Sequence, residues 1–185
     1  MHLDLPDLVT MSASELRALH DRGHRIALAD VEGFLFEGLN LSHPRLLRRL
    51  TWSKFAKTFY RDPRTSRVRG WNEAVEQTPL DEAWSPRTRR GQRIVYGHYE
   101  VTDDDRTDHP TGLLIRYDAR AGSSPSRLDA SRTLYDPLVA LHPDSGDLLL
   151  GYTYVSAGRF RLNTPTWFAL RRGPELDHIA PRPRG

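Results

Sequence analysis

The sequence contains no cysteine, and its only two lysines are Lys54 and Lys57. The absence of cysteine excludes disulfide bonds, zinc sites built on thiolates and catalysis by a thiol. The sequence also lacks the Gly-x-Ser-x-Gly motif of a nucleophilic serine and the Gly-x4-Gly-Lys motif of a phosphate-binding loop. An enzyme that uses an apolar pocket with one or two polar groups needs no such motif. Arginine replaces lysine almost throughout, which indicates a GC-rich coding sequence and a bacterial source.

No apolar run approaches the roughly 20 residues that a membrane-spanning helix needs. The first residues, MHLDLPDLVTMS, carry two aspartates and no lysine or arginine, so they lack the basic start of a signal peptide. Apolar residues make up 38% of the 185 residues and occur in short runs, which is typical of one domain with one core. We expect a soluble cytoplasmic protein with no membrane partner. The oligomeric state is not indicated.

Short apolar runs separated by turn residues predict a mainly β domain. No long helix separates these runs, which favours an eight-stranded antiparallel up-and-down barrel, or a two-sheet β-sandwich, over a parallel α/β sheet. Pro137 interrupts one run and predicts an edge or bent strand there. The eight expected strands are Gly33–Leu39, Ser53–Arg61, Arg67–Gln77, Gln92–Thr102, Gly112–Asp118, Leu134–Leu141, Leu148–Val155 and Thr166–Arg171. The expected core residues are Leu150, Tyr152, Phe168, Leu170, Val95 and Tyr99.

Two short helices are expected before the second strand. Ser12 and Glu15 have the spacing of a capping box, which predicts a helix over Ser12–Arg22 that ends at a left-handed Gly23. The second helix, Pro44–Leu50, has leucines at helical spacing. The single domain is thus divided into a helical segment at 12–32, a barrel at 33–172, and a proline-containing tail at 173–185 that lies loose or against the surface.

Basic residues are concentrated between residues 45 and 69, where nine of them accompany one acid, Asp62. The net charge is +3 and the isoelectric point is about 9.4. Such a segment could follow phosphates. However, its charges alternate with Phe55, Phe59 and Val68, as solvent-facing positions alternate with core positions on a half-buried strand. We therefore expect no specific nucleic-acid site, and a nucleic-acid or partner-binding module is the third hypothesis for function.

Several segments resemble bacterial lipocalin-like (calycin-type) domains of unknown function. Those domains open with a short helix and a Gly-x-Trp-x-Gly strand, and they end with an Asp-Pro turn, a Leu-Leu-Gly strand and an aromatic strand. The first motif lacks its tryptophan here. The resemblance implies a barrel and transfers no catalytic residue. The comparable segments are Gly33–Gly38, Leu50–Phe55, Asp136–Leu138, Leu149–Gly151 and Trp167–Phe168.

Polar aromatic side chains share faces on two of the expected strands. Tyr96 and His98 lie on one face of their strand, and Tyr152 and Tyr154 lie on one face of theirs. A buried polar group left unpaired costs about 1–3 kcal/mol, so these faces favour a cavity with a ligand or ordered water over a dry core. A packed core in which each polar group finds a partner is the alternative. We predict a ligand-binding pocket reached by Trp71, Tyr96, His98, Tyr152 and Tyr154.

The leading hypothesis is a protein that holds one small apolar or aromatic molecule inside a lipocalin-like barrel. The second is an enzyme on the same barrel, such as an isomerase or a cyclase. No metal site is predicted, because Gly23 ends the helix between His20 and His24, and the aspartates at 103–105 lack the glycine and glutamate of a calcium loop. His98 alone could ligate haem or act as a base, but no partner flanks it. The sequence identifies no cofactor.

Overall fold

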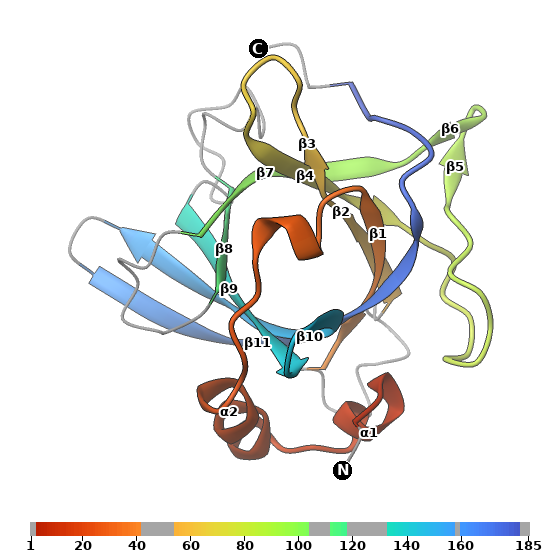
Figure 1. The fold of residues 1–185 in the computed structure, drawn as a ribbon. Helices are drawn as coiled ribbons and strands as arrows, with labels where there is room; N and C mark the ends of the chain where they lie inside the picture. Colours follow the sequence, from red (N-terminus) through yellow and green to blue (C-terminus); the bar gives the residue numbers. More distant parts are fainter. Residues whose placement is uncertain (1–2, 42–53, 104–111, 118–132, 158–159, 182–185) are drawn as a thin grey trace.

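Eight antiparallel strands form a closed barrel in a computed structural model that describes residues 3–41, 54–103, 112–117, 133–157 and 160–181 (Figure 1). Pairing of β1 with β11 and of β2 with β4 closes the sheet. The predicted up-and-down barrel is confirmed, and the two-sheet sandwich is excluded. The barrel strands are β1 (Phe34–Asn40), β2 (Lys54–Thr58), β4 (Val68–Ala74), β7 (Val95–Thr102), β8 (Leu113–Arg116), β9 (Leu134–His142), β10 (Ser145–Ala157) and β11 (Phe160–Glu175).

Three short strands lie beside the barrel. β3 (Tyr60–Arg61) follows β2 and pairs with β4. β5 (Thr88–Arg89) and β6 (Gln92–Arg93) form a hairpin that projects away from the barrel wall (Figure 1). The expected strand Gln92–Thr102 is therefore divided into β6 and β7.

β9 lies between β8 and β10, so the edge position expected for the strand with Pro137 is wrong. In a closed barrel no barrel strand is left with an unpaired edge. Pro137 lies opposite Leu114 of β8. On the side of β10, Leu138 pairs with Gly151 and the next pair is Tyr135 with Tyr154. Pro137 therefore belongs to no pair on this side. Proline is thus accommodated at an interruption of the ladder on one side of the strand.

The N-terminal region folds into α1 (Leu5–Val9) and α2 (Ala13–Asp21). The predicted capping box is present, because the Ser12 amide donates to Glu15 Oε2 at 2.7 Å and the Glu15 amide donates to Ser12 Oγ at 3.3 Å. Gly23 does not have the positive φ that was expected. Its requirement for glycine comes instead from packing, since a Cβ there would lie 2.4 Å from a methyl group of Val139.

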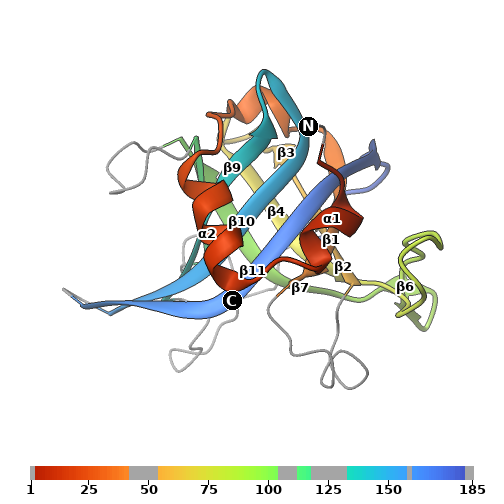
Figure 2. The same cartoon turned by 90° about the horizontal axis from the view of Figure 1, so that it is seen from below.

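Apolar side chains form clusters on both faces of β9, β10 and β11. Because successive residues of a strand point to opposite faces, Leu149 lies inside the barrel while Leu150 lies outside it. The outer face is covered by α1 and α2, as Figure 2 shows. Of the six predicted core residues, five are buried, namely Leu150, Tyr152, Phe168, Leu170 and Tyr99. The sixth, Val95, is half-buried.

The two ends of the barrel differ. A short 3-10 helix, η1 (Leu28–Asp30), lies across one end, and the flanking Ile26 and Val31 are buried in the inner cluster (Figure 1). We call this the η1 end. We call the opposite end the far end. β1 and β8 end there, and β2 and β9 begin there. Residues 42–53 and 118–132, and with them the predicted helix Pro44–Leu50, lie outside the described residues.

Within the described part of the chain, no helix has the length and apolar character needed to cross a membrane. After β11, the Leu176 amide donates to the Gly33 carbonyl at 2.8 Å, and Ala180 is buried.

Candidate functional site

Five polar side chains meet inside the barrel, and we call them the interior polar cluster: Lys57, Asn72, Tyr117, Asp136 and Thr153. The Lys57 ammonium donates to Asn72 Oδ1 at 2.9 Å and to the Tyr117 hydroxyl, and it lies 3.4 Å from Asp136 Oδ2. The Tyr117 hydroxyl donates to the same carboxylate oxygen at 3.0 Å, and Thr153 donates to the other oxygen at 2.8 Å. The Lys57 and Asp136 side chains are each only 3% exposed.

The alternation of side chains along β2 explains why a lysine lies inside. Phe55 and Phe59 belong to or pack against the inner apolar cluster, and Lys57 lies between them on the same face. Lys54 lies on the outer face. Its ammonium donates to the Pro79 and Glu82 carbonyls at 2.7 and 3.0 Å and lies 3.8 Å from the centre of the Trp84 ring. Both lysines of the protein are therefore buried.

The basic segment was expected to face solvent, and the structure corrects this for three described residues. Lys54, Lys57 and Arg69 are buried. Lys57 lies inside the closed barrel, and residues between β4 and β5 cover Lys54 on the outside. Arg69 is buried in an ion pair with Asp62, at 2.8 Å. Arg61 and Arg67 are exposed, and each forms an ion pair with a glutamate. In the described part of segment 45–69, most of the positive charge is thus buried or neutralised.

In the interior polar cluster, burial and charge pairing have opposite effects on the pKa of Lys57. Burial lowers the pKa of the Lys57 amine, and the nearby Asp136 carboxylate partly offsets this effect. Burial, together with the negative charge of Asp136, raises the pKa of Tyr117 well above its usual value. The rings of Tyr99, Tyr117 and Phe168 have their centres 4.8, 5.0 and 5.3 Å from the Lys57 ammonium. These ring faces favour a cation at this position.

The buried tyrosines make the fold less stable at alkaline pH. Burial raises the pKa of Tyr99 and Tyr117 well above the usual value of about 10. The unfolded chain releases these protons near pH 10 whereas the folded chain retains them. The stability that the two tyrosines contribute is therefore complete below about pH 10 and is lost as the pH rises further. We expect the free energy of unfolding, measured in urea, to fall steeply above about pH 10.5. Below that pH, the lowered pKa of Lys57 makes the free energy of unfolding rise with pH, but above it this contribution is constant.

Tyr117→Phe is the control for this titration, because it removes one of the two hydroxyls and should make the alkaline decline shallower. The ultraviolet absorbance of phenolate gives an independent reading. If all seven tyrosines ionise near pH 10 in the folded protein, the expectation is contradicted.

Two of the predicted pocket residues, Trp71 and His98, lie on the outer face of β4 and β7. The Trp71 indole donates to Glu73 Oε1 at 2.8 Å, and the His178 ring of the C-terminal segment lies 2.6 Å from the same oxygen. His98 is buried beside Trp71, with ring centres 6.2 Å apart, and burial lowers its pKa. Tyr96, which is 40% exposed, pairs with Asn72 of the interior polar cluster, and a register shift between this pair and the Gly70–Tyr99 pair separates it from the face of His98, so the shared face expected for Tyr96 and His98 is wrong. His178, in the segment that follows β11, thus contacts both Trp71 and Glu73 on this face.

Tyr152 and Tyr154 lie on the outer face of β10, where the N-terminal helices cover them. Tyr152 contacts the rings of His20 and Trp167, and the Arg17 guanidinium of α2 lies 4.5 Å from its centre. Two strands separate β10 from β7 around the barrel, and three separate it from β4. Tyr152 and Tyr154 therefore lie on a different side of the barrel from Trp71 and His98, and the structure does not bring the five predicted residues into one pocket.

Sequence reasoning missed the interior polar cluster, although one signal was available. Lys57 shares its strand face with Phe55 and Phe59, so the period of two places it with core residues. Asp136 and Thr153 carried no comparable signal, because each is a single polar residue in an apolar run.

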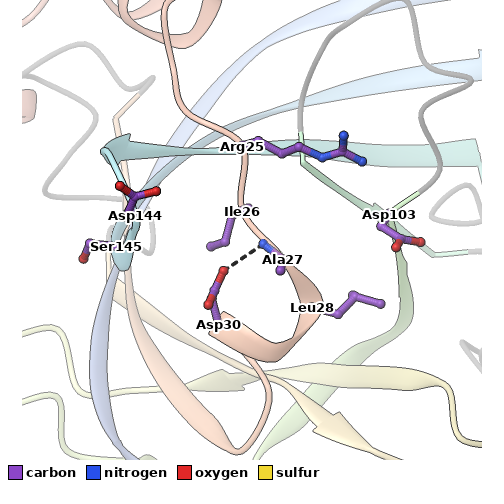
Figure 3. Close-up of a pocket in the computed structure, with 8 residues that line it drawn as sticks. All are labelled: Arg25, Ile26, Ala27, Leu28, Asp30, Asp103, Asp144 and Ser145. Carbon is purple, nitrogen blue, oxygen red and sulfur yellow. Dashed lines mark hydrogen bonds between the residues drawn. The ribbon is translucent and has the colours of Figure 1, made fainter.

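A pocket of about 440 Å³ opens at the η1 end of the barrel (Figure 3). Its polar lining includes three aspartates and one arginine, which is unlike the apolar site that the sequence predicted. The Asp30 carboxylate accepts a hydrogen bond from the Ala27 amide at 2.8 Å and so stabilises η1. The described residues contain no group of three or more side chains placed to hold a metal ion. The lining residues are Arg25, Ile26, Ala27, Leu28, Asp30, Asp103, Asp144 and Ser145.

The interior polar cluster is the better candidate site, because it gathers an amine, a carboxylate and a phenol within hydrogen-bonding distance, away from bulk water. Such a group can bind a polar ligand atom, transfer protons or react as a nucleophile. Relatives do not add to this assignment: no protein-family model matches the chain, and no curated protein matches it.

Proposed function

We propose that the protein binds a small apolar or aromatic molecule inside the barrel, with the polar end of the molecule at Lys57 and Tyr117. The observation that carries the proposal is the buried Lys57–Asp136 ion pair. Removing two charges from water costs several kcal/mol per ion, and well-packed apolar residues often stabilise a core as well or better. A core that served stability alone would have little use for this pair, so its presence supports a role in recognition.

The barrel interior has an apolar part and a polar part, and this division supports the same proposal. Apolar side chains, including Phe36, Ile115 and Leu170, are buried in the inner cluster. The interior polar cluster lies towards the far end, where Tyr117 follows β8 and Asp136 lies near the start of β9. Phe55, Leu134 and Thr153 at this end are only half-buried. A ligand that entered from the far end would meet aromatic walls and a polar floor, as in small-molecule sites generally.

The barrel architecture agrees with this placement. An eight-stranded barrel is just wide enough for side chains to fill it or for one small ligand to be held. The resemblance to lipocalin-like domains of unknown function implies the same architecture. A cytoplasmic location and a bacterial source remain predictions from the sequence.

A second candidate function is an enzyme, such as an isomerase or a cyclase of an apolar substrate. The observation that favours it is the convergence of three ionisable groups, Lys57, Tyr117 and Asp136, inside the barrel. Groups of this kind can act as a general acid and base. Native mass spectrometry of the purified protein, before and after incubation with an extracted ligand, separates the two functions, since a binding protein returns the molecule unchanged and an enzyme alters its structure.

Binding can be tested with Nile red, a neutral apolar dye that fluoresces in apolar sites. In the variant Thr153→Trp, a large side chain replaces the half-buried threonine beside Asp136 and blocks the far end. We expect this variant to bind the dye at least about tenfold more weakly, which corresponds to roughly 1.4 kcal/mol.

The matched control is Thr88→Trp, which adds the same ring to an exposed position on β5 outside the barrel and should leave the affinity unchanged. Circular dichroism and thermal melts check that both variants are folded. Equal dye affinity in the two variants, or the absence of dye binding to the unaltered protein, would refute binding inside the barrel.

A further inference from the structure

The charges of the interior polar cluster restrict the chemistry of a ligand. The cluster holds one cation, Lys57, and one carboxylate, Asp136, while Asn72, Tyr117 and Thr153 are neutral. A ligand with a carboxylate would bring a second negative charge close to Asp136, and an ammonium would face Lys57. Either repulsion is costly in a site removed from water. A neutral carbonyl group leaves the balance of charge intact.

From this balance and the position of the amine we infer that the barrel takes up an apolar or aromatic aldehyde, and that Lys57 holds it as a protonated imine. The inference rests on the proposed function and deepens it, because it names the ligand class and the bond. Buried lysines are the amines that proteins use to form such imines with carbonyl compounds.

The reaction needs no oxidant, reductant or other co-reactant. The Lys57 ammonium first gives one proton to the Asp136 carboxylate, which lies 3.4 Å away. The free amine then attacks the carbonyl carbon, a C–N bond forms, and one N–H proton moves to the former carbonyl oxygen. That hydroxyl leaves as water with the proton from Asp136, and a C=N bond is formed. The sum is one ammonium and one aldehyde converted into one protonated imine and one water.

The protonated imine is compatible with the charges of the interior polar cluster, as the Lys57 ammonium is. The protonated imine carries the same single positive charge as the ammonium, so Asp136 keeps its counter-ion. Tyr117 and Thr153 donate to the two oxygens of this carboxylate and hold it in place. The rings of Tyr99, Tyr117 and Phe168 surround the nitrogen and stabilise a cation there. The lowered pKa of Lys57 adds to the reactivity, because more of the amine is unprotonated at neutral pH.

The chain contains its own reference amine. Lys54, the only other lysine, is also buried, but it lies on the outer face of β2. Its ammonium donates to the Thr78 hydroxyl and to two backbone carbonyls, and among the described residues no carboxylate accepts a hydrogen bond from it. Reaction at Lys57 but not at Lys54 therefore depends on the barrel interior and not on the chemistry of lysine in general.

The test treats the full-length protein with trans-cinnamaldehyde and sodium cyanoborohydride, which reduces an imine to a stable secondary amine. Mass spectrometry of the intact protein and of its peptides then locates the adduct. We expect one adduct at Lys57, with at least about tenfold more modification than at Lys54 or at the N-terminal amine. Lys57→Arg, which keeps the positive charge opposite Asp136, should abolish this adduct, and Lys54→Arg should retain it.

A second arm separates failure of this inference from failure of the proposed function. Cinnamyl alcohol has nearly the same shape as the aldehyde but forms no imine, and its binding is measured by displacement of Nile red. If the alcohol displaces the dye and no adduct forms at Lys57, aldehyde capture is refuted while binding in the barrel is retained. If neither binding nor an adduct is found, both proposals fail. Equal modification of Lys54 and Lys57 in the unaltered protein also refutes the inference, even if Lys57→Arg does not fold.

Discussion

Replacing Asp136 by alanine is expected to lower the free energy of unfolding by about 3–5 kcal/mol, because it leaves a buried cation without its counter-ion. The Lys57 side chain is 3% exposed and cannot recover the lost interaction from water. Tyr117 and Thr153 lose an acceptor at the same time. Urea unfolding followed by circular dichroism measures the difference between the variant and the unaltered protein.

The double variant Lys57→Met/Asp136→Leu is the control, since it removes both charges and fills the space with apolar atoms. Such replacements of a buried ion pair are often neutral or stabilising. We therefore expect the double variant to be more stable than Asp136→Ala and to form no imine at residue 57. If the single and double variants unfold at the same urea concentration, the charge of Lys57 is not what destabilises the single variant.

Replacing Gly70 by alanine is expected to destabilise the barrel by about 3 kcal/mol, at the upper end of the range for overpacked cores. The ring of Tyr99 crosses over Gly70, and its hydroxyl donates to the Thr58 carbonyl at 2.8 Å. A Cβ at position 70 would lie 1.8 Å from that carbonyl oxygen and 2.5 Å from the ring. The oxygen belongs to the backbone of the barrel wall, so it cannot move aside as a flexible side chain would.

Gly91→Ala is the matched control for this substitution. Gly91 lies in the turn between β5 and β6 with a φ of +75°, and no atom lies within 4 Å of a Cβ placed there. Alanine at position 91 should cost only the backbone strain of a left-handed residue, about 1–2 kcal/mol. Thermal melts of the two variants distinguish them, and a Gly70→Ala protein as stable as Gly91→Ala would show that the barrel wall can yield at Thr58.

The barrel was predictable from the sequence because its apolar runs are short and are separated by turn residues. The inside and the outside of the barrel were not predictable from the same pattern. On β10, Leu149 faces the interior and Leu150 faces α1 and α2, so both faces are apolar and the period of two does not tell them apart. The pocket residues proposed from shared strand faces were therefore placed without knowing which face turned inward.

The interior position of Lys57 could have been inferred from its strand face, but its contacts could not be predicted, because they join residues that are distant in the sequence. Lys57 meets Asp136 across a separation of 79 residues and Tyr117 across 60. Local patterns report on neighbouring residues only, and a lysine in a basic segment is usually solvated. The helix α1 was missed for a different reason: it has only five residues, which is too short for a clear helical period.

The burial of both lysines has a consequence for how this chain can be modified. Lys54 is 0% exposed and Lys57 is 3% exposed, and the sequence has no other lysine. Enzymes that attach ubiquitin or acetyl groups to lysine need the amine and several bonds of its side chain to enter their own active sites. The folded chain offers them no such amine. Conjugation at Lys57 would thus be coupled to opening of the barrel, and conjugation at Lys54 to displacement of the residues between β4 and β5 that cover it. A bulky, charged acylating reagent applied to the protein would report how often each of these openings occurs.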